Sequence, residues 1–282
     1  MLNENKIINI ERTVSYIILA FLVFISIFPF IILIVNSSRL HTEITKGFSI
    51  VPGTYFFDNW KSLFSDLNIP ILSALGNSVF ISALTALFSV YFSALTAYAI
   101  FMYNFKGKEF AFRFIMLVMM VPPQVSALGF IRLIMKLNLM NSFVPLIIPA
   151  IASPVIFFFI LQYMKASLPT EIVEAARIDG SGEIRTFNTI VFPILKPAIA
   201  VQAIFSFVGS WNNYFMPALI IDSKFKKTIP ILIAQLRSAD YMKFDLGKVY
   251  MLIFIAIVPL MIVYLFLSRY IIKGITMGSV KG

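Results

Sequence analysis

The stretch EAARIDGSGEIRTFNTIVFP, Glu174–Pro193, interrupts a chain that is otherwise mostly apolar. Apolar residues make up 60% of the 282 residues, charged residues make up 13%, and the mean hydropathy is +0.91. Within this stretch, by contrast, acidic and basic side chains crowd around two glycines. A soluble domain of this size does not need so much apolar side chain, so we expect a polar segment between membrane-embedded parts.

Long uncharged windows lie on both sides of this stretch. A helix needs about 20 apolar residues to cross the hydrocarbon core, and its backbone groups must be hydrogen-bonded within the helix. The windows are Val14–Val35, Ile71–Phe105, Phe114–Ile131, Leu137–Met164, Pro197–Ile221 and Val249–Ser268. The first is too long for a typical signal peptide, so we expect it to be retained. The sequence therefore predicts an all-α polytopic membrane protein with six transmembrane helices.

The second window carries small residues at close spacing. They are Ser78, Ser82, Ala86, Ser89, Ser93 and Ala97. Small residues let the backbones of membrane helices approach closely, so this stripe predicts an internal packing face.

The charges of the loops do not orient the six predicted spans. An even number of spans places both termini on the same side of the membrane. If that side is cytoplasmic, the cytoplasmic segments hold 12 Lys and Arg residues and the outer segments hold 11. Cytoplasmic loops normally carry a clear excess of these residues. The distribution of Lys and Arg between the two sides therefore does not indicate the orientation of the protein in the membrane.

The sequence contains no recognisable catalytic or nucleotide-binding motif. GxxxxGK[ST], HExxH and GxSxG are absent, as is cysteine, and the single histidine, His41, has no neighbouring metal ligands. The uncharged windows hold no Asp or Glu of the kind that ion-coupled carriers often need. We expect no catalytic residue, metal or cofactor in this chain, and an energy source elsewhere. The net charge of +10 is expected to reflect basic loops at lipid headgroups, not nucleic acid.

The polar stretch and the residues before it predict two short helices. Thr170 is the expected N-cap of the first helix, and Gly180 is the expected left-handed residue that ends it. Ser181 is the expected cap of the second, and Pro193 is expected to stop it. Its apolar stripe is Ile184, Phe187 and Val191.

The first of these helices has a blunt surface of small residues. Ala175 and Ala176 would allow a partner to approach closely, and the Glu174 carboxylate could pair with an arginine or hydroxyl of that partner. The residues alone also fit a solvated loop that merely connects two spans.

The same residues resemble the EAA motif of ABC-importer permeases. That pattern is EAA, three residues, Gly, nine residues and I-x-L-P, and Glu174–Ala176, Gly180, Ile190 and Pro193 match it. Phe192 is the one departure, standing where leucine is usual. AARIDG, WNNYFMPALI at Trp211–Ile220 and the C-terminal tail are similar to the carbohydrate, MalG-type subunits of this family.

The resemblance implies a type I importer architecture and several partners. Two homologous permeases would form a heterodimeric pore, two cytoplasmic ATPases would bind ATP and magnesium beneath it, and a binding protein outside would deliver sugar. The implied ATPase-coupling residues are Glu174, Ala175, Ala176, Gly180, Gly278 and Lys281. The chain itself would not be an enzyme.

The resemblance also orients and divides the chain. It implies a bacterial-type inner-membrane protein with a cytoplasmic N-tail at 1–13 and a permease domain at 14–270. The coupling loop at 165–193 and the C-tail at 271–282 would be cytoplasmic.

A sugar path is expected near the fifth window. Amides and aromatic rings suit sugars, whose hydroxyls need hydrogen bonds and whose C–H faces pack on flat surfaces. The candidates are Asn77, Gln124, Ser210, Trp211, Asn213 and Tyr214. Polar contacts between helices would explain the same residues without a substrate.

The most direct function is that of the permease subunit of a sugar importer, with a di- or oligosaccharide as substrate. A permease for amino acids or polyamines, an ion-coupled carrier or channel, and a membrane enzyme are the alternatives. Acidic residues in the path would favour cationic cargo, and a buried carboxylate would favour ion coupling.

Overall fold

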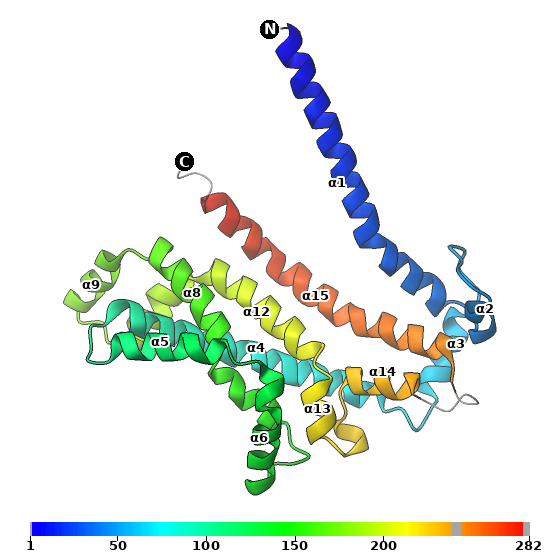
Figure 1. The fold of residues 1–282 in the computed structure, drawn as a ribbon. Coiled ribbons are helices and arrows are strands. Elements are labelled where there is room, and N and C mark those ends of the chain that lie inside the picture. Colours follow the sequence, from blue (N-terminus) through cyan, green and yellow to red (C-terminus); the bar gives the residue numbers. More distant parts are fainter. Residues whose placement is uncertain (1, 239–243, 279–282) are drawn as a thin grey trace. The chain divides into compact units, whose positions relative to one another are not determined.

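The computed structural model describes residues 2–238 and 244–278 (Figure 1). Within them every regular element is a helix, which confirms the all-α prediction. The chain divides into two compact units, Met1–Ile69 with Ile233–Ile257 and Pro70–Leu232 with Val258–Gly282. The division falls inside α14 (Ile229–Arg237) and α15 (Leu246–Gly278).

The first unit is built on a long apolar helix and two short ones. These are α1 (Leu2–Ser37), α2 (His41–Thr45) and α3 (Phe56–Phe64). The Asn59 side chain donates to the carbonyls of Ser37 (2.9 Å) and Arg39 (3.0 Å), which stabilises the end of α1. His41 accepts a hydrogen bond through Nδ1 from the Leu246 N–H at 3.2 Å, so its role here is structural.

The second unit holds the remaining elements. They are α4 (Ile71–Met102), α5 (Lys108–Met119), α6 (Pro123–Lys136), α7 (Val144–Ile147), η1 (Ile148–Ile151), α8 (Pro154–Ser167), α9 (Thr170–Ile178), α10 (Glu183–Thr186), η2 (Phe187–Val191), α11 (Phe192–Ile194), α12 (Lys196–Trp211), α13 (Phe215–Ile220) and η3 (Lys224–Lys226). α4 packs against both α8 and α12 (Figure 1).

The small-residue stripe of α4 is buried, as predicted. Each of its six members has at most 7% of its surface exposed. The Ser89 and Ser206 hydroxyl oxygens are 2.7 Å apart, which joins α4 to α12 through a hydrogen bond. The stripe is therefore a helix-packing face.

Within residues 2–238 and 244–278 the structure has four to six candidate membrane spans. Four helical segments are long and apolar enough to cross a membrane, Arg12–Ser37, Ile71–Met102, Val144–Ser167 and Leu246–Ser268. Two bent pairs, Lys108–Met119 with Gln124–Lys136 and Glu183–Ile194 with Lys196–Trp211, raise the number to six if each pair is one span. The predicted window Phe114–Ile131 is thus two helices separated near Pro122, where proline disfavours a continuous helix.

The fifth window also breaks where one helix was expected. α12 ends at Trp211 and α13 begins at Phe215. Pro217 has no N–H to donate to the carbonyl of Asn213, and its ring would clash there in a continuous helix. The predicted window Pro197–Ile221 is therefore not a single continuous helix.

Candidate functional site

The loop between α8 and α12 begins with α9. Pro169 is the N-cap of α9, with φ −67° and ψ 128°, and Thr170 is its first helical residue. The prediction that Thr170 caps the helix was wrong by one position. The fixed φ of proline lets Pro169 lead directly into the first turn, where Glu171 lies at the favourable positive end of the helix dipole.

The end of α9 is a Schellman turn around Gly180, as predicted. Gly180 has φ +77°, a conformation that costs a residue with a side chain about 1 kcal/mol. Its N–H donates to the Arg177 carbonyl at 3.0 Å, and the Ser181 N–H donates to the Ala176 carbonyl at 2.9 Å. Ser181 does not cap the next helix: Gly182 does, and the Ser181 hydroxyl instead accepts a hydrogen bond from Thr186.

The helical turn separates the three motif residues. Val173 and Ala176 are buried, whereas Glu174 and Ala175 are exposed. Ala176 therefore packs inward and is not part of the blunt outer surface that was predicted. Ile178 lies one turn after Glu174 and Ala175 and is 86% exposed, so it joins them on one face. We call Glu174, Ala175 and Ile178 the outer face of α9.

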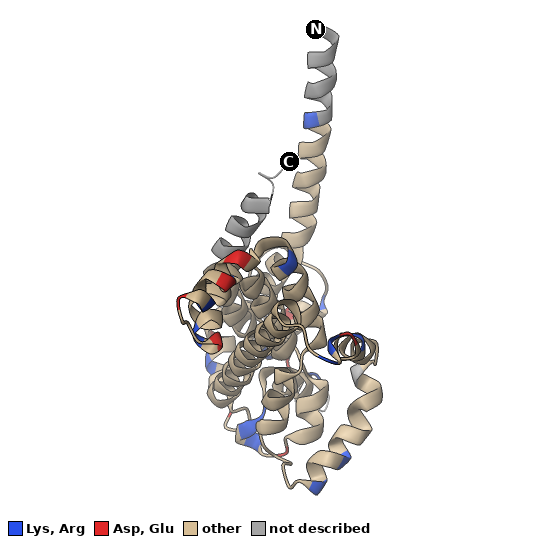
Figure 2. Cartoon of the chain, turned by 90° about the vertical axis from the view of Figure 1, so that its left-hand side faces the viewer, with Lys and Arg blue, Asp and Glu red and all other residues tan. Residues whose placement is uncertain are grey.

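Ile178 was missed in the sequence, although its spacing could have found it. An isoleucine at i+4 from Glu174 and i+3 from Ala175 must share their side of the helix. An exposed apolar residue beside a carboxylate and an alanine is the composition that a protein-contact surface requires. Figure 2 shows acidic and basic residues gathered on the helices of this loop.

A charged network lies behind the outer face of α9. Arg177 Nε donates to Glu183 Oε1 at 2.7 Å, and the Tyr98 hydroxyl donates to Glu183 Oε2 at 2.8 Å. The guanidinium carbon of Arg177 is 5.3 Å from the centre of the Tyr103 ring. The hydrogen bond to Glu183 raises the pKa of Arg177, and burial raises the pKa of Tyr103. No sequence pattern had connected these four residues.

The second helix of the loop continues further than predicted. α10, the π-helical turn η2 and α11 follow one another to Ile194, so Pro193 lies inside helical structure and does not stop it. Pro193 is in the first turn of α11, where the missing N–H is tolerated. The direction changes by 83° at the break before α12.

Aromatic packing fixes this second helix against α4. Phe187 is fully buried, with ring centroids 5.8 Å from Tyr91 and 5.5 Å from Tyr98. Phe192 lies 5.8 Å from both Tyr91 and Phe187. The departure from the usual leucine therefore extends an aromatic cluster.

Three of the six predicted sugar-path residues make well-defined contacts within the protein. Asn77 donates to the carbonyls of Phe225 (2.8 Å) and Lys227 (3.0 Å). Trp211 is 3% exposed and stacks on Phe207. The Met216 N–H donates to Asn213 Oδ1 at 3.3 Å.

The remaining path candidates are more open. Ser210 at the end of α12 is half-buried, Tyr214 is 49% exposed, and Gln124 is exposed in the first turn of α6. Ser210, Trp211, Asn213 and Tyr214 thus gather around the break between α12 and α13, whereas Asn77 binds the segment around η3. Their role in a sugar path stays a prediction.

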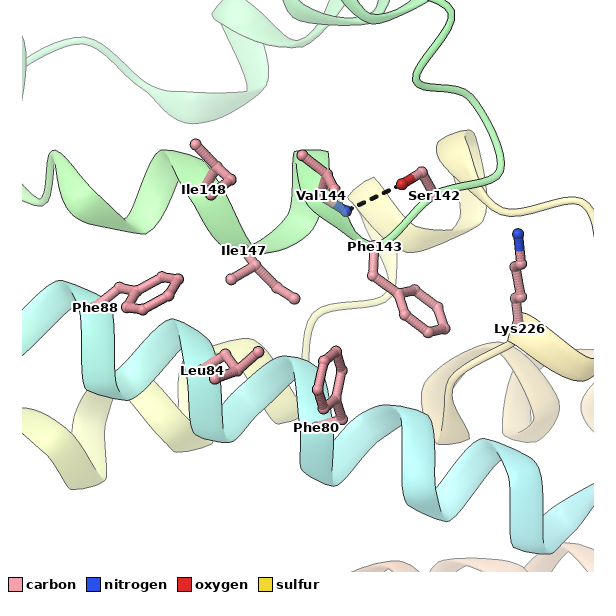
Figure 3. Close-up of a pocket in the computed structure, with 9 residues that line it drawn as sticks. All are labelled: Phe80, Leu84, Phe88, Ser142, Phe143, Val144, Ile147, Ile148 and Lys226. Carbon is pink, nitrogen blue, oxygen red and sulfur yellow. Dashed lines mark hydrogen bonds between the residues drawn. The ribbon is translucent and has the colours of Figure 1, made fainter.

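A separate groove of about 440 Å³ lies between α4 and the segment from Ser142 to Ile148 (Figure 3). Its other lining residues are Phe80, Leu84, Phe88, Phe143, Val144, Ile147 and Lys226. Polar groups are confined to Ser142 and Lys226, and the Lys226 ammonium donates to the Asn141 carbonyl at 2.7 Å. The apolar lining offers few hydrogen-bonding groups for a sugar, and no predicted path residue belongs to it.

The predicted contacts of the C-tail are only partly described. Gly278 is the last residue of α15. Lys281 lies outside the described residues. Among residues 2–238 and 244–278, no group of three His, Cys, Asp or Glu side chains could hold a metal ion.

Relatives of the chain cover nearly all of its length. It is 36% identical to the arabinooligosaccharides transport system permease protein AraQ of Halalkalibacterium halodurans, over 93% of this chain and 94% of that protein. It is 31% identical to the lactose transport system permease protein LacG of Rhizobium radiobacter, over 95% of this chain and 96% of that protein. Both are named as transport permeases, in agreement with the resemblance seen in the EAA motif.

The fold also matches a solved structure. A chain of a bacterial ABC transporter involved in the import of the acidic polysaccharide alginate has a TM-score of 0.80 and 18% identity. The match covers 93% of this chain and 96% of the other. Residues 89–277 match the family described as binding-protein-dependent transport system inner membrane component. The chain therefore belongs to this family of multi-pass transport permeases.

Proposed function

We propose that this chain is the permease subunit of an ATP-driven importer of carbohydrates, forms half of the translocation pore and receives energy through α9. The chain would bind no nucleotide itself. ATP and magnesium would be bound by two cytoplasmic ATPase subunits, and a second, homologous permease would complete a heterodimer. A sugar-binding protein would dock on the opposite side of the membrane.

The outer face of α9 is the observation that carries this proposal. Glu174, Ala175 and Ile178 are exposed on one face of α9, whereas Val173 and Ala176 are buried. Glu174 offers a carboxylate, Ile178 an apolar side chain, and Ala175 a side chain small enough to let another protein approach closely. This combination suits a protein partner. The EAA spacing supports an ATPase as that partner, and with it a cytoplasmic location for the loop at 165–193 and for both termini.

The remaining coupling contacts follow from the same orientation. Gly180 would set the angle at which the chain leaves α9, and the tail with Gly278 and Lys281 would approach the ATPase pair. A di- or oligosaccharide is the substrate class supported by the names of the two relatives, which refer to arabino-oligosaccharides and lactose.

The substitution Glu174→Lys tests the docking. In the complex purified from its own cells, we expect the ATPase activity recovered per permease to fall about tenfold or more, because losing one partner of a desolvated charge pair costs several kcal/mol. Glu109→Lys is the matched control, since Glu109 forms only an exposed pair with Arg113 at 3.9 Å. Equal recovery for both variants would refute the docking.

The substrate class needs its own measurement. Uptake of labelled lactose, maltose, raffinose and arabino-oligosaccharides should reveal at least one transported sugar, and Glu174→Lys should abolish its uptake. A complex that imports an amino acid or a polyamine, but none of these sugars, would contradict the carbohydrate assignment.

A further inference from the structure

The Glu183 carboxylate bridges two parts of the fold that are far apart in sequence. Its Oε1 accepts from Arg177 of α9, and its Oε2 accepts from Tyr98 near the end of α4. Tyr103, just beyond α4, lies against the Arg177 guanidinium and has its ring centre 6.1 Å from that of Tyr98. Each carboxylate oxygen thus accepts one hydrogen bond, Oε1 from α9 and Oε2 from α4.

Apolar packing alone fixes α9 weakly. Of its nine residues, only Val173 and Ala176 are buried. Two buried apolar residues on one side of a short helix constrain its rotation about its own axis less than directional hydrogen bonds do, because apolar burial is not directional. Hydrogen bonds with a charged partner are directional and stronger than neutral ones, so the network supplies the constraint that packing lacks.

The network connects buried and exposed surroundings. Tyr98 is 3% exposed and its ring packs against the fully buried Phe187. The side chains of Arg177 and Glu183 are 32% and 41% exposed. The bridge therefore runs from the core around α4 to the base of α9, behind the outer face that carries Glu174.

We propose that Tyr98, Glu183 and Arg177 are positioning residues that join α9 to the end of α4, so that a displacement of α9 moves α4. This inference rests on the proposed docking of α9 on an ATPase and adds the path by which the motion enters the membrane. Tyr98→Phe removes the hydrogen bond between α4 and Glu183 and leaves the Arg177–Glu183 pair in place. Glu183→Gln weakens both connections.

A distance measurement within this chain tests the positioning. The chain has no cysteine, and Lys106 and Glu171 are exposed residues of the α4–α5 loop and of α9, so Lys106→Cys and Glu171→Cys give one clean pair of spin labels. We expect a single narrow distance peak for the nucleotide-free complex in lipid nanodiscs. Tyr98→Phe should broaden it, and Glu183→Gln should broaden it further.

Tyr91→Phe is the matched control for the loss of a hydroxyl. Tyr91 lies two turns earlier on α4, contacts Phe187 with its ring, and donates to Asn188 over a longer 3.3 Å. Its removal should leave the distance peak unchanged. An unchanged peak in both Tyr98→Phe and Glu183→Gln, or equal broadening by Tyr91→Phe, would overturn the inference.

A second readout separates positioning from docking. Glu183→Gln should keep the ATPase bound, whereas the ATP hydrolysed per molecule of the sugar identified by the uptake panel should rise several-fold. Loss of ATPase binding in Glu183→Gln would assign Glu183 to docking and contradict the proposal. If the unmodified chain recruited no ATPase, the proposed function would fail, and the label distances would still decide whether the network fixes α9.

Discussion

At the scale of single residues, the EAA motif combines two different requirements. Each residue of a helix turns by about 100° from the one before it. Ala175 consequently faces outward with Glu174, whereas Ala176 faces inward and is 7% exposed. The small side chain of Ala175 leaves room for a partner on the outer face. That of Ala176 lets α9 pack closely against the rest of the loop.

Because the two alanines face different sides of α9, replacing each by leucine should affect different properties, stability at Ala176 and ATPase binding at Ala175. Ala176→Leu should lower the thermal unfolding midpoint of the purified protein, because overpacking costs about 1–3 kcal/mol. Ala175→Leu should leave that midpoint unchanged and reduce ATPase binding, because the larger side chain stands on the outer face. Equal unfolding midpoints for the two variants would contradict the inward placement of Ala176.

Sequence reasoning reached some of these residues and not others. Gly180 was predicted correctly because helix termination is a local problem with a local signal. The hydrogen-bond partners of Asn77 could not be predicted, because these two carbonyls lie 148 and 150 residues away in the chain. The same holds for Glu183, whose bond to Tyr98 spans 85 residues. Such long-range contacts depend on how the helices pack against one another, and a short sequence motif cannot predict them.

At the scale of elements, the glycines around the end of α9 have unequal roles. Gly180 has φ +77°, whereas Gly182, the N-cap of α10, has φ −70°. A Cβ added at either position would meet no atom within 4 Å. Any difference between alanine substitutions here therefore comes from the backbone conformation and not from crowding.

Gly180→Ala should consequently cost about 1 kcal/mol or more of stability, since a side chain disfavours the left-handed conformation. Gly182→Ala should cost less than Gly180→Ala, because alanine adopts φ −70° without strain and loses only the preference of glycine for the N-cap. The unfolding midpoints of the two variants, together with the ATPase bound by each, measure this difference. Equal midpoints would mean that the Schellman turn does not need its glycine.

Helix breaks were the elements that sequence reasoning placed least well. Window length suggested continuous spans at Phe114–Ile131 and Pro197–Ile221, but the structure divides both. Pro122 and Pro217 were visible in the sequence, yet proline also occurs in unbroken membrane helices, as Pro259 does within α15. The π-helical turn at Phe187–Val191 had no sequence signal that could have predicted it.

At the scale of the whole molecule, the number of spans depends on the two bent helix pairs. The four long helical segments satisfy the requirement for crossing a membrane individually. Six crossings, the number of the apolar windows, result if each bent pair also crosses, and the second pair begins at Glu183, within the predicted loop at 165–193. Loop charges do not decide the matter because they are nearly equal on the two sides.

Single-cysteine labelling distinguishes six crossings from four. With a cytoplasmic N-terminus, six crossings place Lys136 outside and Glu171 inside, whereas four exchange them. Lys46 lies outside and Lys106 inside in both cases, so they serve as controls. All four are exposed, and the chain has no other cysteine.

A membrane-impermeant maleimide should label Lys46→Cys and Lys136→Cys in intact cells, and Lys106→Cys and Glu171→Cys only after lysis. Labelling of Glu171→Cys in intact cells would exclude both the six-span topology and the docking of α9 on a cytoplasmic ATPase.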